Sequence, residues 1–403
     1  MAAEAAHFTE ATAGSLLLMA GGAFAIPLLC RPVRLPAAVG EILFGILVGP
    51  YVLDWVEPSA FMHLMAELGF FLLMFIGGLE LDFTQIEKGG IKPLLRGLLT
   101  TILVLAFSFG LASALGFGWF VGMVLGAISI GIPLVLLQET GLGRTAFGQD
   151  LLLAGSVGEF CLILLATGLS AHAATGGIGV EFFTELAKLI VVFALAYGLL
   201  VVFRTLVWWK SESFARVVSY HDPSEIGVRA GLALMFAFVG VTAFLHIEPI
   251  LGAFIAGALF SFVLRAKGPL ELKFMSIGNG FFIPFFFISV GLGFNLEAAR
   301  RGDFALFVKL LLCLVVVRLA AFALTNPKGR GIHHVLSGAL LYSAPLTLLV
   351  VVANLGLSLE LIDATFHATV ILLAVVSSTV YPFLFKLVVK KLPELQSPPE
   401  RSH

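Results

Sequence analysis

Long apolar runs, separated by short polar stretches, extend along almost the whole chain. A helix needs roughly 20 mostly apolar residues to cross about 30 Å of hydrocarbon, and thirteen runs fit this pattern. They lie near residues 14–30, 35–53, 62–80, 95–115, 118–138, 149–171, 183–207, 226–246, 249–265, 276–294, 304–325, 334–355 and 361–388. Helices satisfy their own backbone groups in lipid, and no alternating barrel-strand pattern is visible. The pattern predicts an all-α polytopic membrane protein with about thirteen transmembrane helices.

Composition supports this prediction and excludes several other classes of protein. Hydrophobic residues make up 59% of the chain and charged residues 12%, against roughly 45–50% and 25% in soluble domains. The net charge of −1 gives no basic surface for nucleic acid. The three cysteines have no paired spacing, and no phosphate-binding loop or dinucleotide fingerprint occurs. We therefore expect neither an enzyme nor a cofactor.

The basic residues indicate how the helices are oriented. Lys and Arg gather in the loops on one side of the thirteen segments, whereas only Arg300 and Arg301 fall on the side of the N-terminus. Because cytoplasmic loops carry the excess of positive charge, we expect the N-terminus outside and the C-terminus inside. Residues 392–403 are then a short cytoplasmic tail. The host is expected to be a bacterial cytoplasmic membrane.

The sequence also repeats itself weakly. The segment Gly40–Gly45 is similar to Gly252–Gly257, and Pro133 corresponds to Pro345, both at an offset of 212 residues. Glycines at helix contacts recur in any bundle, which is the simpler explanation. The offset nevertheless covers seven segments, an odd number, so the second unit would be inverted. Inverted repeats are typical of secondary transporters.

This interpretation gives one transmembrane transporter domain over residues 1–403. Its first repeat covers about 14–171 and its second about 226–388, with a linking helix at about 183–207. Such transporters bind substrate near the membrane midplane at interrupted helices. We expect the protein to contact the lipid bilayer and not to bind nucleic acid.

Both repeats contain a candidate interruption at equivalent positions. The fifth segment holds Ser129, Gly131 and Pro133, and the twelfth holds Ser343 and Pro345. Proline removes a backbone donor and disturbs the preceding turn. A simple kink is the alternative at either proline alone. The paired placement predicts two discontinuous helices that cross.

Two charged side chains are expected at membrane depth, where a charge costs at least ~2.5–3.5 kcal/mol and usually marks a pathway. Glu159 lies in the sixth segment, with Ser156 one turn before it, and Arg318 lies in the eleventh. We expect Glu159 and Ser156 to bind the transported ion and Arg318 to pair with Glu159. A purely structural ion pair is the alternative.

Four segments resemble the monovalent cation:proton antiporters, in the Kef-like branch. They are residues 35–50, residues 66–82, Gly148-Gln149 followed by Glu159, and residues 278–292. The resemblance extends over about 14–390. It implies a homodimer in which spans four to six and eleven to thirteen form a moving core. It also implies that Glu159 binds either cation or proton, and that Arg318 is the basic residue of the eleventh span.

The chain departs from this family at two adjacent positions. Glu159 stands where the family usually has Asp, and Gly158 stands where many members have a second acid, Asn or Gln. A single carboxylate favours a one-for-one, electroneutral exchange of Na+ or K+ for protons. Two alternatives stay open. One is a sodium-coupled symporter of an organic anion bound by Arg318, and the other is a gated cation channel or sensor module.

Overall fold

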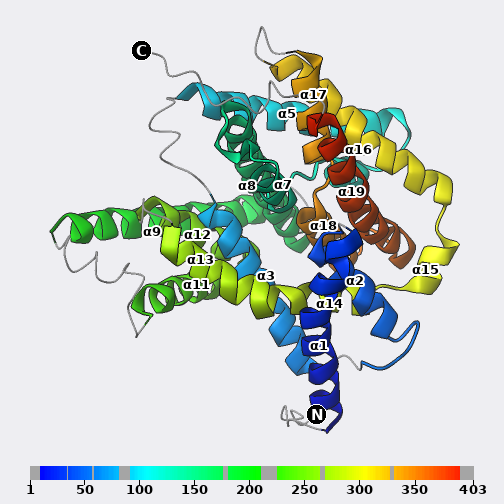
Figure 1. Ribbon diagram of the computed structural model, residues 1–403. Coiled ribbons are helices and arrows are strands. Elements are labelled where there is room, and N and C mark those ends of the chain that lie inside the picture. The colour runs from blue at the N-terminus through cyan, green and yellow to red at the C-terminus, as the bar shows by residue number, and fades with distance from the viewer. Residues whose placement is uncertain are drawn as a thin grey trace. The chain divides into compact units, whose positions relative to one another are not determined.

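The computed structural model describes residues 10–33, 35–56, 59–80, 91–175, 180–209, 225–263, 268–326 and 331–390. Within these ranges every regular element is helical (Figure 1). The α-helices are α1 Glu10–Val33, α2 Ala37–Val48, α3 Ala60–Leu79, α5 Ile91–Ala114, α6 Trp119–Gly126, α7 Gly131–Glu139, α8 Ala146–Thr175, α9 Val180–Trp209, α11 Ile226–Phe244, α12 Pro249–Val263, α13 Gly268–Ile277, α14 Ile283–Leu292, α15 Leu296–Arg301, α16 Phe304–Thr325, α17 Ile332–Tyr342, α18 Leu346–Ser358 and α19 Ala364–Lys390.

The lengths of these helices agree with the predicted spans. In the described part of the chain, nine helices are long and apolar enough to cross a membrane, and a bent pair, α17 with α18, makes a tenth. Three shorter apolar helices lie within Ala37–Val48, Ala187–Val202 and Pro249–Val263. Each of the thirteen predicted segments contains one of these elements. The all-helical membrane fold is therefore confirmed.

The chain divides into two compact units. The first comprises Met1–Thr84 and Thr167–Phe294. Its helices approach one another closely through glycines: a Cβ at Gly45 of α2 would meet the carbonyl of Ile288, and one at Gly291 of α14 would meet that of Ile42. Small residues permit such backbone contact between membrane helices. The packing of α2 on α14 thus depends on these glycines.

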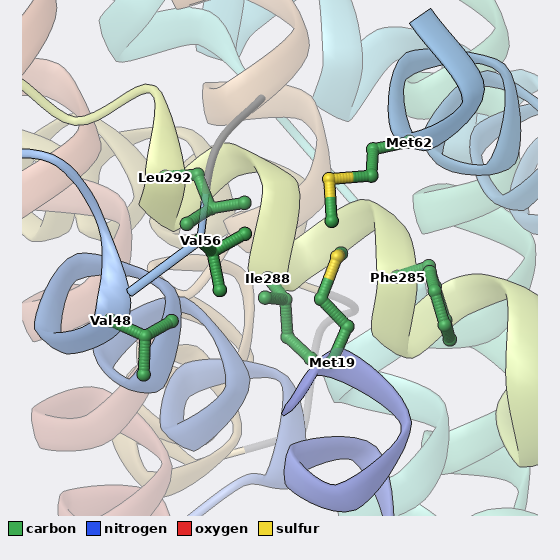
Figure 2. Close-up of a cluster of buried hydrophobic side chains, with 7 residues drawn as sticks. All are labelled: Met19, Val48, Val56, Met62, Phe285, Ile288 and Leu292. Carbon is green, nitrogen blue, oxygen red and sulfur yellow. The ribbon is translucent and has the colours of Figure 1, made fainter. Parts of the chain in front are cut away.

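Side chains fill the space beside this contact. Figure 2 shows a cluster drawn from α1, α2, α3, α14 and the segment after α2. Its buried members are Met19, Val48, Val56, Met62, Phe285, Ile288 and Leu292. Met62 belongs to the first turn of α3, which Ser59 caps by accepting a hydrogen bond from the Met62 N–H at 3.3 Å. A serine cap satisfies one of the free donors at a helix start.

The second unit comprises Gln85–Ala166 and Asn295–His403. It holds α5, α6, α7, most of α8, and α15 to α19, with α5 packed against α6 and α16. This grouping contains spans four to six and eleven to thirteen, the same set that the family resemblance assigns to the core. Both interrupted helices and both intramembrane charges belong to this unit.

The two interruptions lie close to where the sequence places them. Residues 127–130 separate α6 from α7, and residues 343–345 separate α17 from α18, which are bent by 47°. Gly131 and Pro133 belong to the first turn of α7, not to the break itself. Proline is tolerated there because the first N–H groups of a helix have no partner within it. Pro345 precedes the first residue of α18.

Candidate ion-binding site

Glu159 lies on α8 beside the break between α6 and α7. Its side chain is only 2% exposed. Oε2 accepts a hydrogen bond from the Ile130 N–H at 3.2 Å, and Oε1 accepts one from Ser129 Oγ at 3.5 Å. Ile130 immediately precedes α7, and the start of a helix favours negative charge because its N–H dipoles point outward. The interruption of the fifth span thus provides the environment of the carboxylate.

The second interruption reaches the same place through a hydroxyl pair. Ser129 Oγ lies 2.5 Å from Thr347 Oγ1, which belongs to the first turn of α18. Both residues are buried. The two interruptions therefore come within hydrogen-bonding distance of each other. They gather the Glu159 carboxylate and the hydroxyl groups of Ser129 and Thr347 in one place. Sequence reasoning singled out Ser129 but missed Thr347, although Thr347 follows Pro345 by only two residues.

Arg318 lies buried in the eleventh predicted span, on α16, but its contacts differ from the prediction. Its fully buried side chain donates from Nε to the Tyr342 carbonyl at 2.6 Å and from Nη1 to the Leu125 carbonyl at 2.9 Å. It also donates to the carbonyl of Ala127 and, at 2.8 Å, to that of Leu314. The predicted ion pair with Glu159 is absent from the described part of the chain.

The reason lies in the carbonyl groups that an interrupted helix exposes. The last carbonyls of a helix have no partner within it, and that end of the helix carries partial negative charge. The guanidinium has five donors in a rigid fork, which suits the ends of α6 and α17 at once. Arg318 therefore joins both interruptions and does not neutralise Glu159.

Ser156 is buried one turn before Glu159, as its position in the helix predicts. Its hydroxyl donates to the Leu152 carbonyl at 3.0 Å, which is the usual bond of a serine inside a helix. Ion binding by Ser156 stays a prediction. Ser129 contacts the carboxylate and Thr347 contacts Ser129, so these two hydroxyl groups are better placed as ligands.

Tyr342 is a further buried residue that sequence reasoning missed. It is the last residue of α17, and its hydroxyl donates to the Leu151 carbonyl on α8. Its ring stacks on Phe322, with centroids 5.5 Å apart. Gly155 permits this arrangement, because a Cβ there would lie 2.5 Å from the tyrosine hydroxyl. The available sequence signal was a tyrosine directly before Ser343, at the second predicted interruption.

This set of oxygen atoms suits an alkali cation. Carboxylate, hydroxyl and carbonyl oxygens are ligands for hard cations. Among the described residues, no group of three or more His, Cys, Asp or Glu side chains is arranged to hold a metal ion. The site has one ionisable carboxylate, which either a proton or a monovalent cation can neutralise.

Comparison with known proteins agrees with this geometry. The family described as "Sodium/hydrogen exchanger, transmembrane" matches residues 19–391. A putative Na+/H+ antiporter of Bacillus subtilis, YjbQ, is 29% identical over 399 residues, which cover 94% of this chain and 63% of that protein. The Na+/H+-K+ antiporter GerN of Bacillus cereus is 25% identical over 87% of this chain and 89% of its own length.

A solved structure has the same fold. The sodium proton antiporter MjNhaP1 of Methanocaldococcus jannaschii matches 96% of this chain and 97% of its own, with a TM-score of 0.63 at 15% sequence identity. The match of the family model over most of the chain is decisive for classification. The protein is a membrane transporter and no enzyme, and it belongs to the transmembrane sodium/hydrogen exchanger family.

Proposed function

We propose that this protein is a secondary antiporter that exchanges Na+ or K+ for protons at Glu159. The observation that carries the proposal is a single carboxylate, buried where two interrupted helices meet. YjbQ is described as a putative Na+/H+ antiporter and GerN as a Na+/H+-K+ antiporter, and these descriptions support the choice of substrates.

Competition at one carboxylate couples the two ions. When Glu159 is ionised, its oxygens hold a partly dehydrated cation with the hydroxyls of Ser129 and Thr347. When a proton binds Glu159, the negative charge disappears and the cation leaves. An uncompensated charge is costly at membrane depth, so the core changes its exposure only with one of the two ligands bound.

The same arrangement favours electroneutral exchange. One carboxylate carries either one proton or one monovalent cation, so the loaded site has the same net charge in both cases. Arg318 keeps its charge against the carbonyls of α6 and α17 and takes no part in the competition. In this mechanism, Arg318 holds the two breaks together while Glu159 binds the cargo.

The finer assignments are part of the same proposal. We infer that the chain belongs to the Kef-like branch, works as a homodimer and uses the second unit as its moving core. We also infer that it lies in a bacterial cytoplasmic membrane with its C-terminus inside. These assignments rest on the sequence motifs and on the distribution of Lys and Arg.

The test is dissipation of a pH gradient by the purified protein in proteoliposomes. Adding Na+, K+ or Li+ in turn ranks the cations, and an imposed membrane potential tests electroneutrality. We expect cation-dependent dissipation that does not respond to the potential and is lost in Glu159→Gln. Dissipation retained in that variant refutes the role of Glu159, and a voltage-dependent rate refutes one-for-one exchange.

A further inference from the structure

A glycine directly precedes the carboxylate residue on α8, and an isoleucine of the first interruption lies against it. A Cβ at Gly158 would lie 2.9 Å from both Cδ1 and Cγ2 of Ile128 and 3.1 Å from its Cβ. Ile128 is one of residues 127–130 between α6 and α7, and its side chain is 4% exposed. Because β-branched side chains are stiff at χ1, Ile128 cannot swing aside freely. It therefore occupies the space that a side chain at position 158 would need.

The two residues that follow Ile128 contact the carboxylate. Ser129 Oγ donates to Oε1 of Glu159, and the Ile130 N–H donates to Oε2. The Ile130 side chain is apolar and 2% exposed. Among residues 127–130, Ser129 is thus the only one with a polar side chain. A cation at Glu159 finds the Ser129 hydroxyl on this interruption, and hydrocarbon in place of a ligand from position 158.

Many carbonyl groups at the two interruptions are already engaged. Donors bind the carbonyl oxygens of Leu125, Ala127, Ile130, Tyr342, Ala344 and Pro345. Arg318 supplies the donors for three of them, and backbone N–H groups supply the others at 2.8–3.0 Å. A bound cation is therefore left mainly with the carboxylate of Glu159 and the hydroxyl groups of Ser129 and Thr347.

We propose that Ile128, packed on Gly158, is the residue that sets the cation preference of this site, and that the site selects Na+ and Li+ over K+. The proposal rests on the antiport function proposed above and adds a choice among its cations. Gly158 provides the room for Ile128, and Ile128 closes the side of the site that a ligand at position 158 would otherwise supply.

Two properties of such a site favour the smaller cation. The attraction between a cation and a carboxylate rises as their separation falls, so a small cation gains most from Glu159. This gain offsets the higher cost of removing water from a small cation. A larger cation needs a wider space and more oxygen ligands, since ligand number and cavity size decide between ions. Ile128 removes both, because it fills the space beside Gly158 and contributes no oxygen.

The first experiment compares Ile128→Thr with Ile128→Val in proteoliposomes. Both variants shorten the side chain by one carbon, and they differ only in that Thr carries a hydroxyl where Val has a methyl group. The readout is the ratio of the KM for K+ to the KM for Na+, measured by dissipation of a pH gradient. We expect the ratio to fall about fivefold in Ile128→Thr, the equivalent of ~1 kcal/mol, because the new oxygen helps the larger cation more. In Ile128→Val it should stay within about twofold of wild type.

The second experiment rebuilds the side chain that position 158 lacks. Gly158→Asn alone should slow exchange of every cation and lower Tm, because its side chain collides with Ile128 and overpacking is destabilising. Ile128→Ala/Gly158→Asn removes the collision, so we expect it to regain exchange and to lower the KM ratio about fivefold. Ile128→Ala/Gly158→Leu, with a side chain of similar shape but no amide oxygen, is the matched control. Its KM ratio should stay within about twofold of wild type.

The outcomes separate this proposal from the proposed function. If wild type exchanges no cation for protons, the antiport function itself fails. If wild type exchanges cations but its KM for K+ is no higher than that for Na+, antiport stands and the selection of Na+ is refuted. Equal KM ratios in Ile128→Thr and Ile128→Val, or in the two double variants, refute the role of Ile128. A defect in Gly158→Asn that Ile128→Ala does not relieve contradicts the steric relation between the two positions.

Discussion

Arg318→Met tests whether one guanidinium holds the two interruptions together. The change leaves three carbonyl oxygens outside the residue's own helix, those of Leu125, Ala127 and Tyr342, without their donor. An unsatisfied buried acceptor costs about 1–3 kcal/mol, but removing the buried charge recovers several kcal/mol of desolvation. Three unsatisfied acceptors together cost about 3–9 kcal/mol, which exceeds the recovered desolvation, and we expect a net destabilisation of about 3–5 kcal/mol.

Thermal unfolding of the purified protein in detergent measures this effect. With an unfolding entropy of about 2.1 cal/mol/K per residue, the chain of 403 residues should lose about 4–6 °C in Tm. Arg318→Lys keeps the charge but has a compact group with three donors, so the Tm of this variant should lie between those of wild type and Arg318→Met. Lys309→Met removes an exposed cation from the same helix and should change Tm by less than about 1 °C. A Met variant as stable as wild type refutes the reasoning.

Other substitutions test the packing and the ligands. Gly45→Ala places a Cβ 2.9 Å from the Cα of Gly291 on α14 and should lower the free energy of unfolding by at least about 1–3 kcal/mol. Gly110→Ala, whose Cβ meets open space, is the control. Equal Tm values for the two variants contradict this account of the packing. Ser129→Ala and Thr347→Ala should each raise the KM for the cation about fivefold, the equivalent of ~1 kcal/mol, with little change in kcat. Ser156→Ala should raise KM less than either of these changes. A larger rise in Ser156→Ala would show that Ser156, and not Ser129 or Thr347, is the ligand.

Much of the fold follows from the sequence because membrane spans are long and apolar. Each of the thirteen predicted segments contains an apolar helical element. The interruptions were also found from sequence, since proline and small polar residues mark them in both repeats. The first interruption lies a few residues before the position predicted from Pro133, because proline fits the first turn of a helix as readily as it ends one.

The contacts within the site could not be predicted in the same way. Arg318 was expected to pair with Glu159 because an acid is the obvious partner for an intramembrane base. Carbonyl groups freed by a broken helix leave no trace in the residue type, so sequence gave no sign that they bind Arg318. Thr347 and Tyr342 were missed for a related reason, since their contacts join positions about 190–220 residues apart.

The most direct test of the central claim is proton release when the purified protein binds its cation. In weakly buffered detergent solution, at a pH low enough that Glu159 carries its proton before the cation is added, Na+ or K+ should release one proton from wild type for each cation bound, because the proton and the cation need the same carboxylate. Glu159→Gln, with its folding checked by Tm, should release none and bind the cation weakly. Cation binding without proton release in wild type, or undiminished release in Glu159→Gln, would contradict competition at this residue.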